Sequence, residues 1–266
     1  MTRPHFRAWP YLVATLVVAH FMCVPISAAA TLDDAQMENL VRRSYQYVAM
    51  YNVNNNFAMQ EANPFSTNGW NKLFVPTGLM DHTVTAIARP NNDTLYPIAM
   101  LDMRDDAIVI HFPAFDSKYV SLETSAYDHY IDIPLSTTKG DFEKPTTMLF
   151  YTDRTRGYDG EPGDGIDKTL KMTGDFAIAF LRVAPHASEP ARLQRNLEAM
   201  QKQKIMTLSE FRGGRTLAAR RSSPAAMHIT HRSPVEFPAF GNDQMVFRNN
   251  FLEVMQFVVN HTTFDP

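Results

Sequence analysis

The sequence predicts an α+β fold, in which an antiparallel β-sandwich or barrel-like core is flanked by N- and C-terminal helices. Apolar residues recur at helical spacing near both ends of the chain. Runs of β-branched and aromatic residues, bounded by Pro, Gly, Asn or Asp, fill the middle. No helical pattern separates these runs, so we expect antiparallel pairing rather than βαβ units.

The composition is that of a globular protein, and the charge excludes one class of function. The chain has 266 residues, of which 45% are hydrophobic and 20% are charged, and its net charge is −3. A mildly acidic chain does not bind nucleic acids through its overall field, so we expect no nucleic-acid partner.

Residues 1–30 have the layout of a secretory signal peptide. Arg3 and Arg7 precede an apolar stretch over residues 11–26, and the small residues 27–30 follow it. An uncleaved membrane anchor is the alternative, because residues 11–30 are about long enough to span a bilayer. Pro25 and the small-residue ending favour cleavage.

The expected mature chain is a single β-rich domain over residues 31–266. Cys23, the single cysteine, lies in the signal segment, so the mature chain is cysteine-free and cannot form disulfides. We expect an exported protein in the periplasm, with an extracellular location as the alternative, and no membrane association after signal cleavage.

Three helical segments are predicted in the mature chain. The first covers residues 32–59, with Asp33 and Asp34 in its first turn, where the helix dipole favours negative charge. Four asparagines within residues 52–56 predict that it ends or frays there. The other two helices cover residues 189–204 and 244–259.

The predicted strands lie between these helices. They cover residues 83–88, 94–103, 107–112, 118–127, 146–152 and 175–183.

Two polar stretches are candidate sites. Asn91, Asn92 and Asp93 open directly into an apolar strand, and they are residues that favour turns. Their role is either turn chemistry or a polar binding mouth. If they form a binding mouth, Asp93 acts as a base or a hydrogen-bond acceptor, the asparagine amides donate hydrogen bonds, and the phenol hydroxyl of Tyr96 donates one as well.

The second stretch is one face of the strand at residues 118–127. Strand alternation places Tyr119, Ser121, Glu123 and Tyr127 on the same side, with Ser125 among them. This face is either ordinary solvent-facing sheet or a pocket wall for a sugar or an organic acid.

The sequence predicts neither a metal site nor a cofactor. Well-known nucleotide, nucleophile-elbow and zinc-protease motifs are absent. His82, His111 and His129 lie on or beside strands and would need the fold to bring them together. The acidic loop at residues 157–167 does not match an EF-hand.

Several of these residues carry a resemblance to a known family. Residues 90–96, the pair Leu101 and Asp102, and residues 108–113 and 118–122 together resemble the "domain of unknown function 1254" family. Arg182 resembles the arginine that ends a later strand in that family. The resemblance implies a β-rich fold with flanking helices and no established reaction.

Members of that family often carry a second β domain, "domain of unknown function 1214", which this sequence does not contain. Self-association, as a homo-oligomer, or a separate partner chain therefore stays open.

Three functions are compatible with these observations. The first is binding of a small polar or carbohydrate-like ligand on the β core. The second is a hydrolase- or lyase-type enzyme with Asp93 or His82 as acid or base and Tyr96 as proton donor. The third is an assembly module, because the C-terminal helix is apolar over more than one face. The residues expected to bind the ligand are Asn91, Asn92, Asp93, Tyr96, Asp102, Tyr119, Ser121, Glu123, Tyr127 and Arg182.

Overall fold

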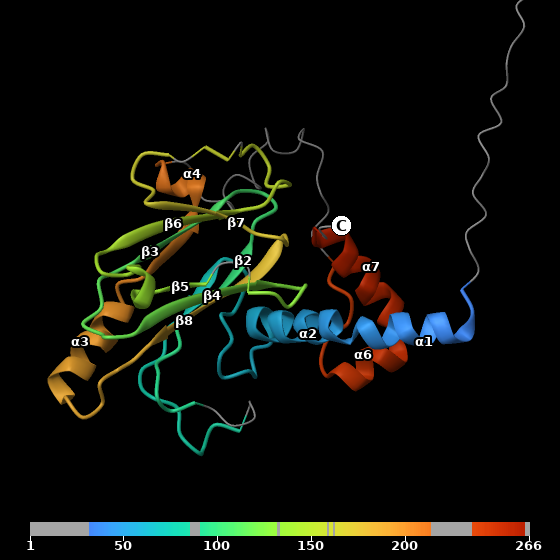
Figure 1. Ribbon diagram of the computed structural model, residues 1–266, viewed down its shortest axis with the longest axis horizontal. Helices are drawn as coiled ribbons and strands as arrows, with labels where there is room; N and C mark the ends of the chain where they lie inside the picture. The colour runs from blue at the N-terminus through green and yellow to red at the C-terminus, as the bar shows by residue number, and fades with distance from the viewer. Residues whose placement is uncertain are drawn as a thin grey trace, which may run out of the picture.

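The computed structural model describes residues 32–85, 91–131, 134–158, 160–161, 163–213 and 236–263. The predicted signal segment, residues 86–90 and residues 214–235, which include His228 and His231, lie outside these ranges. In the described part, two stacked sheets form one end of the molecule, and α1, α2, α6 and α7 extend from them (Figure 1).

The two sheets confirm the predicted α+β sandwich, and neither closes into a barrel. The first has the strand order β1 (Lys72–Phe74), β2 (Ile98–Asp102), β8 (Phe176–Val183), β4 (Val120–Ala126) and β5 (Leu135–Ser136). The second has the order β7 (Lys168–Lys171), β6 (Thr146–Tyr151), β3 (Ile108–Phe112) and β9 (Lys204–Thr207). All neighbouring strands are antiparallel except β6 and β7, which are parallel.

The main core lies between the sheets, and strand alternation explains which residues enter it. Val120, Leu122 and Ala126 of β4 are buried in the same cluster as Leu181 and Val183 of β8. The intervening residues of both strands therefore point to the outer face of the five-stranded sheet. Part of that face is covered by the end of α2 and the chain that follows it.

The predicted N-terminal helix is present but divided. It consists of α1 (Asp34–Arg43) and α2 (Tyr45–Met59), and Asp33 caps α1 with a capping box that includes Gln36. Ser44 separates the two helices, and its hydroxyl donates to the carbonyl oxygen of Leu40 at 2.8 Å. Such a side-chain bond to the preceding turn is typical of a bend in a helix.

The prediction that asparagines 52–56 end or fray this helix is wrong. The helix α2 continues to Met59, and two of the asparagine side chains make tertiary hydrogen bonds that help to hold it. Asn52 donates to Asp243 Oδ1 at 2.9 Å, and Asn56 donates to the carbonyl oxygen of Gly241 at 3.0 Å.

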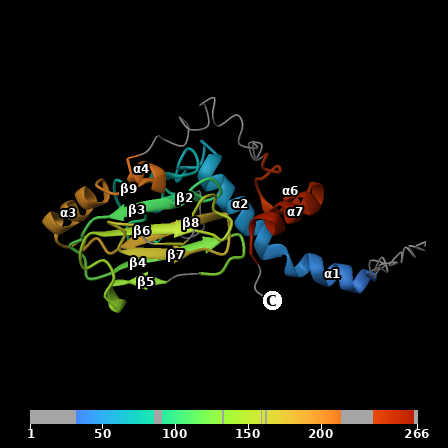
Figure 2. The ribbon, with the colours of Figure 1, turned by 90° about the horizontal axis from the view of Figure 1, so that it is seen from above.

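The C-terminal helix is also two helices. They are α6 (Asp243–Asn249) and α7 (Phe251–His261), separated at Asn250, whose side chain donates to the carbonyl oxygen of Ala239 at 2.9 Å. Both pack against α2. Viewed from above, one sheet overlies the other, and α1 points away from both (Figure 2).

The remaining elements refine the predicted boundaries. The helix α3 (Pro190–Met200) ends earlier than predicted, and α4 (Leu208–Phe211) follows β9. Residues 83–85 do not form the start of a strand. The strands β1, β5, β7 and β9 are not predicted, because each has four residues or fewer and no clear alternation. No described helix is long and apolar enough to cross a membrane.

Candidate functional site

Five of the predicted residues meet on the open part of the outer sheet face. The register of β4 and β8 places Ser121 opposite Arg182 and Glu123 opposite Phe180. A bridge between Leu95 and Val183 brings Tyr96 to the other side of β8. We call Tyr96, Tyr119, Ser121, Glu123 and Arg182 the Arg182 patch.

Arg182 is at the centre of the patch. Its Nη1 forms a hydrogen-bonded ion pair with Glu123 Oε1, and the two side chains are 34% and 29% exposed. The Arg182 guanidinium carbon lies 6.0 Å from the ring centroid of Tyr96 and 5.8 Å from that of Phe180, at the limit of a cation–π contact. The Arg182 Nε is buried and has no hydrogen-bond partner in the described part of the chain.

Tyr119 and Ser121 extend the patch along β4. The Tyr119 hydroxyl donates to Ser121 Oγ at 2.9 Å. Tyr119 is partly exposed, whereas Ser121 is buried. The exposed part of the patch therefore consists of Tyr119, one guanidinium and one carboxylate, whereas Tyr96 and Ser121 are buried.

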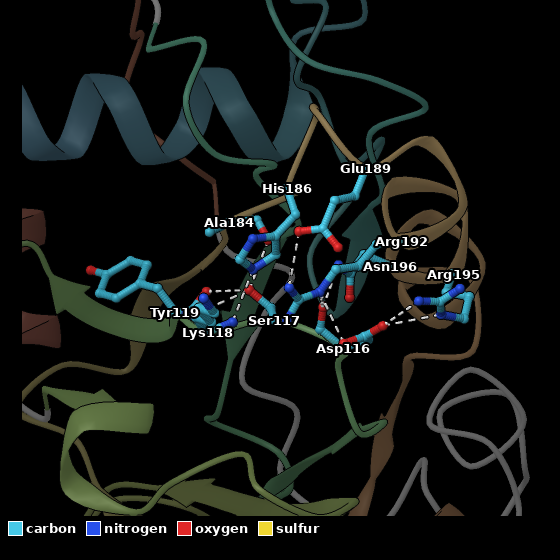
Figure 3. A network of polar contacts seen from close by, with 10 residues as sticks. All are labelled: Asp116, Ser117, Lys118, Tyr119, Ala184, His186, Glu189, Arg192, Arg195 and Asn196. Atoms are coloured by element: carbon cyan, nitrogen blue, oxygen red, sulfur yellow. Dashed lines mark hydrogen bonds and ion pairs between the residues drawn. The ribbon is translucent and has the colours of Figure 1, made fainter.

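A polar network holds the chain that leads into β4 (Figure 3). Asp116 accepts hydrogen bonds from Arg192 Nε at 3.0 Å and Arg195 Nη2 at 2.6 Å, and these cations hold the pKa of its carboxyl group below the usual range. Ser117 Oγ donates to the carbonyl oxygen of Ala184 at 2.7 Å.

Two hydrogen bonds donated by backbone amides also belong to this network (Figure 3). The Lys118 amide donates to His186 Nε2 at 3.0 Å, and the Ala184 amide donates to the Tyr119 carbonyl oxygen at 2.9 Å. The loop before β4 is thereby fixed to the end of β8 and to α3, and Tyr119 is fixed with it.

Asn91, Asn92 and Asp93 lie outside this contact network. All three are exposed, and the Asp93 amide donates to Asn91 Oδ1 at 2.7 Å, the pattern of an Asx turn. The turn interpretation therefore accounts for their positions. Among the described residues, no hydrogen bond or ion pair joins Asp93 or the exposed His82 to the patch.

Tyr127 and Asp102 also lie outside the Arg182 patch, in contacts that hold the fold together. Tyr127 follows the end of β4 and is fully buried against Tyr51 and Phe176, and burial raises the pKa of its hydroxyl well above the ordinary value. Asp102 holds Arg104 through two bonds of 2.9 and 2.8 Å, and this guanidinium lies over the ring of Phe176.

Sequence reasoning missed a second polar cluster, centred on Asp175. Its buried carboxylate contacts His261 Nδ1 at 2.9 Å and Arg154 Nε at 3.0 Å. Burial raises the pKa of Asp175, but the hydrogen bond from His261 and the charge of Arg154 outweigh it and leave the pKa below 3.8. His261 is 86 positions from Asp175, so no sequence spacing could have revealed the pair.

Neighbouring contacts indicate that this cluster fastens the end of α7 to the sheets. The Asp175 amide donates to the His261 carbonyl oxygen at 2.8 Å, and Thr263 bonds to Thr173 and Arg154.

A separate open cleft lies at the end of α2. It has a volume of about 310 Å³, and its lining includes Asn56, Phe57, Gln60 and Asn63. None of its lining residues belongs to the Arg182 patch. In the described ranges, no three His, Cys, Asp or Glu side chains are grouped to hold a metal ion.

The sequence of this chain matches one known protein family. The family model described as "Protein of unknown function (DUF1254)" matches residues 70–207, just over half of the chain. The chain belongs to the DUF1254 family. The matched region contains all five residues of the Arg182 patch, and the family resemblance noted in the sequence is confirmed. No functionally curated protein is detectably similar to this DUF1254 chain.

Two solved structures are similar to the DUF1254 chain. The VPA0106 protein from Vibrio parahaemolyticus is 20% identical, with a TM-score of 0.54 over 84% of this chain and 47% of that chain. A putative uncharacterized protein from Burkholderia cenocepacia is 16% identical, with a TM-score of 0.31 over 64% of this chain and 50% of that chain. The DUF1254 chain thus spans about half the length of each, and the first likeness concerns the fold alone.

Proposed function

We propose that this protein is an exported binding protein that holds a small, hydroxyl-rich ligand, such as a sugar or a hydroxy acid, at the Arg182 patch. The observation that supports this best is the partly exposed ion pair of Arg182 and Glu123 beside the ring of Tyr96. The proposal concerns binding, and it assigns no reaction to Asp93 or His82.

The chemistry of the patch fits neighbouring hydroxyl groups. A guanidinium only donates hydrogen bonds and a carboxylate only accepts them, whereas a hydroxyl does both. One hydroxyl-rich ligand can therefore bridge Arg182 and Glu123 without leaving either charge unpaired. The rings of Tyr96 and Phe180 add an apolar surface, as in many small-molecule sites.

An ordinary surface ion pair is the competing explanation. Exposed pairs contribute little to stability, typically about 0–1 kcal/mol, so their presence alone does not indicate a site. The unpaired, buried Nε of Arg182 and the framing by aromatic rings favour the binding interpretation.

Native mass spectrometry of the protein purified from an exporting host, without added ligand, is the first test. We expect a chain that has lost about its first 30 residues, together with a bound small molecule. An intact N-terminus in the cytoplasmic fraction would contradict the export part of the proposal.

Calorimetric titration with maltose, gluconate and citrate then tests the patch. We expect Arg182→Gln and Glu123→Gln to weaken binding of the accepted probe by about tenfold or more. Asp153→Asn and Lys171→Gln are matched controls, because they change another exposed ion pair, and they should bind normally. Equal binding by the patch variants would exclude this site.

A further inference from the structure

The helix α1 carries an apolar stripe that the described chain leaves uncovered. Met37, Leu40 and Val41 lie on one face, because they are three and four residues apart. Met37 and Leu40 are both 48% exposed, and no residue of α1 is buried. Figures 1 and 2 show α1 extending away from the sheets.

The charges of α1 are divided between its ends. Asp34 and Glu38 lie in its N-terminal half, and Arg42 and Arg43 form its C-terminal end. Glu38 and Arg42 form an ion pair within the helix, but both side chains are at least 70% exposed. Such an exposed pair contributes little and leaves both charges accessible to a partner.

This charge pattern is complementary to itself in one orientation. When two copies of α1 lie antiparallel, the acidic half of each faces the basic half of the other. A parallel arrangement would instead place like charges together. A two-fold axis perpendicular to the two helices gives this antiparallel arrangement, and two-fold symmetry is the commonest symmetry of homo-oligomers.

We propose that α1 pairs antiparallel with α1 of a second copy of this chain, with the Met37, Leu40 and Val41 stripes in contact. The occupant is a second copy because the helix supplies both the apolar stripe and the complementary charges for it. This inference is independent of ligand binding at the Arg182 patch.

The size of α1 sets the expected strength of the pairing. Ten residues make a helix about 15 Å long, which covers less than the roughly 800 Å² per partner of a standard interface. The helix α7 lies at the same end of the molecule (Figure 1), and its exposed residues Leu252 and Val259 are further apolar surface. We expect a weak dimer, with a Kd of about 10 µM.

Analytical ultracentrifugation of the protein as its host processes it tests the proposal. Arg42→Glu with Arg43→Glu makes α1 acidic, and Asp34→Lys with Glu38→Lys makes it basic. We expect each double variant alone to associate at least about tenfold more weakly. An equimolar mixture of the two should recover a dimer, because opposite charges then meet.

Two controls separate this surface from others. Lys202→Glu with Lys204→Glu makes the same change of charge on exposed residues elsewhere and should leave the dimer intact. Leu252→Glu tests the α7 surface alone. Far-UV circular dichroism shows whether each variant retains its helices.

Several results would overturn the proposal. They are a monomeric protein at about 100 µM, undiminished self-association of both charge variants, a mixture that stays monomeric, or a dimer that Leu252→Glu abolishes while both charge variants keep it. Weaker association at higher salt would support it, because salt screens exposed charges.

Discussion

Asp175 shows how one residue depends on partners far away in the chain. Its buried carboxylate contacts both His261 and Arg154, which come from the end of α7 and from the loop after β6. These partners stabilise the ionised form in spite of burial, which is why the pKa lies below 3.8. A group with a depressed folded pKa stabilises the native state above its unfolded pKa, and this stabilisation is lost as the pH falls through the folded pKa.

We therefore expect Asp175→Asn to lower the free energy of unfolding at neutral pH by about 2 kcal/mol, because bonds to a charged group are lost. The difference from the wild type should shrink as the pH falls through the acid range, because the wild-type carboxylate is then also protonated and the stabilisation by its charge is lost. Urea denaturation at pH values from neutral to acid measures this difference. Asp153→Asn, in an exposed pair, is the control and should change stability by less than about 0.5 kcal/mol. A constant difference across this pH range would show that the charge of Asp175 is not involved.

At the residue scale, the candidate site shows which features the alternation within one strand predicts and which it does not. Alternation alone predicts that Tyr119, Ser121 and Glu123 share a face, because successive side chains in a strand point to opposite sides. The pairing of Glu123 with Arg182 depends on the register of β4 with β8, which a single strand does not contain. Tyr127 continues the same alternation, but the strand ends at Ala126 and its ring enters the core.

At the scale of elements, the helices differ in what holds them. The helix α6 buries Val246 and contacts α2, whereas α1 buries none of its residues and depends on its capping box. Short helices with little tertiary packing are marginal in water. Local capping should therefore matter more for α1 than for α6.

Asp33→Ala tests this difference by removing the N-cap of α1, which typically costs about 1 kcal/mol. We expect amide hydrogen exchange in α1 to become about fivefold faster or more, because the helix frays. Asn242→Ala removes the corresponding cap of α6, where packing against α2 should limit the effect. Equal acceleration in both helices would show that tertiary packing does not distinguish them.

The same scale shows why some elements were predictable. Longer strands such as β4 and β8 carry enough alternation to be recognised, and both lie within their predicted ranges. The asparagines of α2 have poor helix propensity, yet the helix continues through them, and Asn52 and Asn56 contact Asp243 and Gly241. Those contacts join residues 191 and 185 positions apart, so the sequence near α2 does not contain them.

At the scale of the whole molecule, Phe176 joins the sandwich to the helices. It begins β8, and its ring lies 4.9 Å from Trp70 and 5.9 Å from Phe257, measured between ring centroids. Arg104 covers the same ring at 4.8 Å. The aromatic cluster around Phe176 therefore connects α7 and the sheets through one fully buried side chain.

Phe176→Ala should lower the free energy of unfolding by about 3–5 kcal/mol, since it leaves a cavity at this junction. Guanidinium denaturation followed by tryptophan fluorescence measures the change, because Trp70 contacts the ring. Tyr130→Ala, at a residue 67% exposed, should change stability by no more than about 0.5 kcal/mol. A loss below about 1 kcal/mol in Phe176→Ala would mean that the helices and the sheets are held together elsewhere.

The sequence by itself determined the α+β class, the long strands, the helical ends and the polar face of β4. These features follow from periodicity, which is a property of neighbouring residues. Only the tertiary structure decided that the strands form an open sandwich, that Arg182 meets Glu123 and Tyr96, that Asp175 meets His261 and that the described residues leave α1 uncovered. Register and packing decide these pairings, because they depend on which distant segments lie side by side.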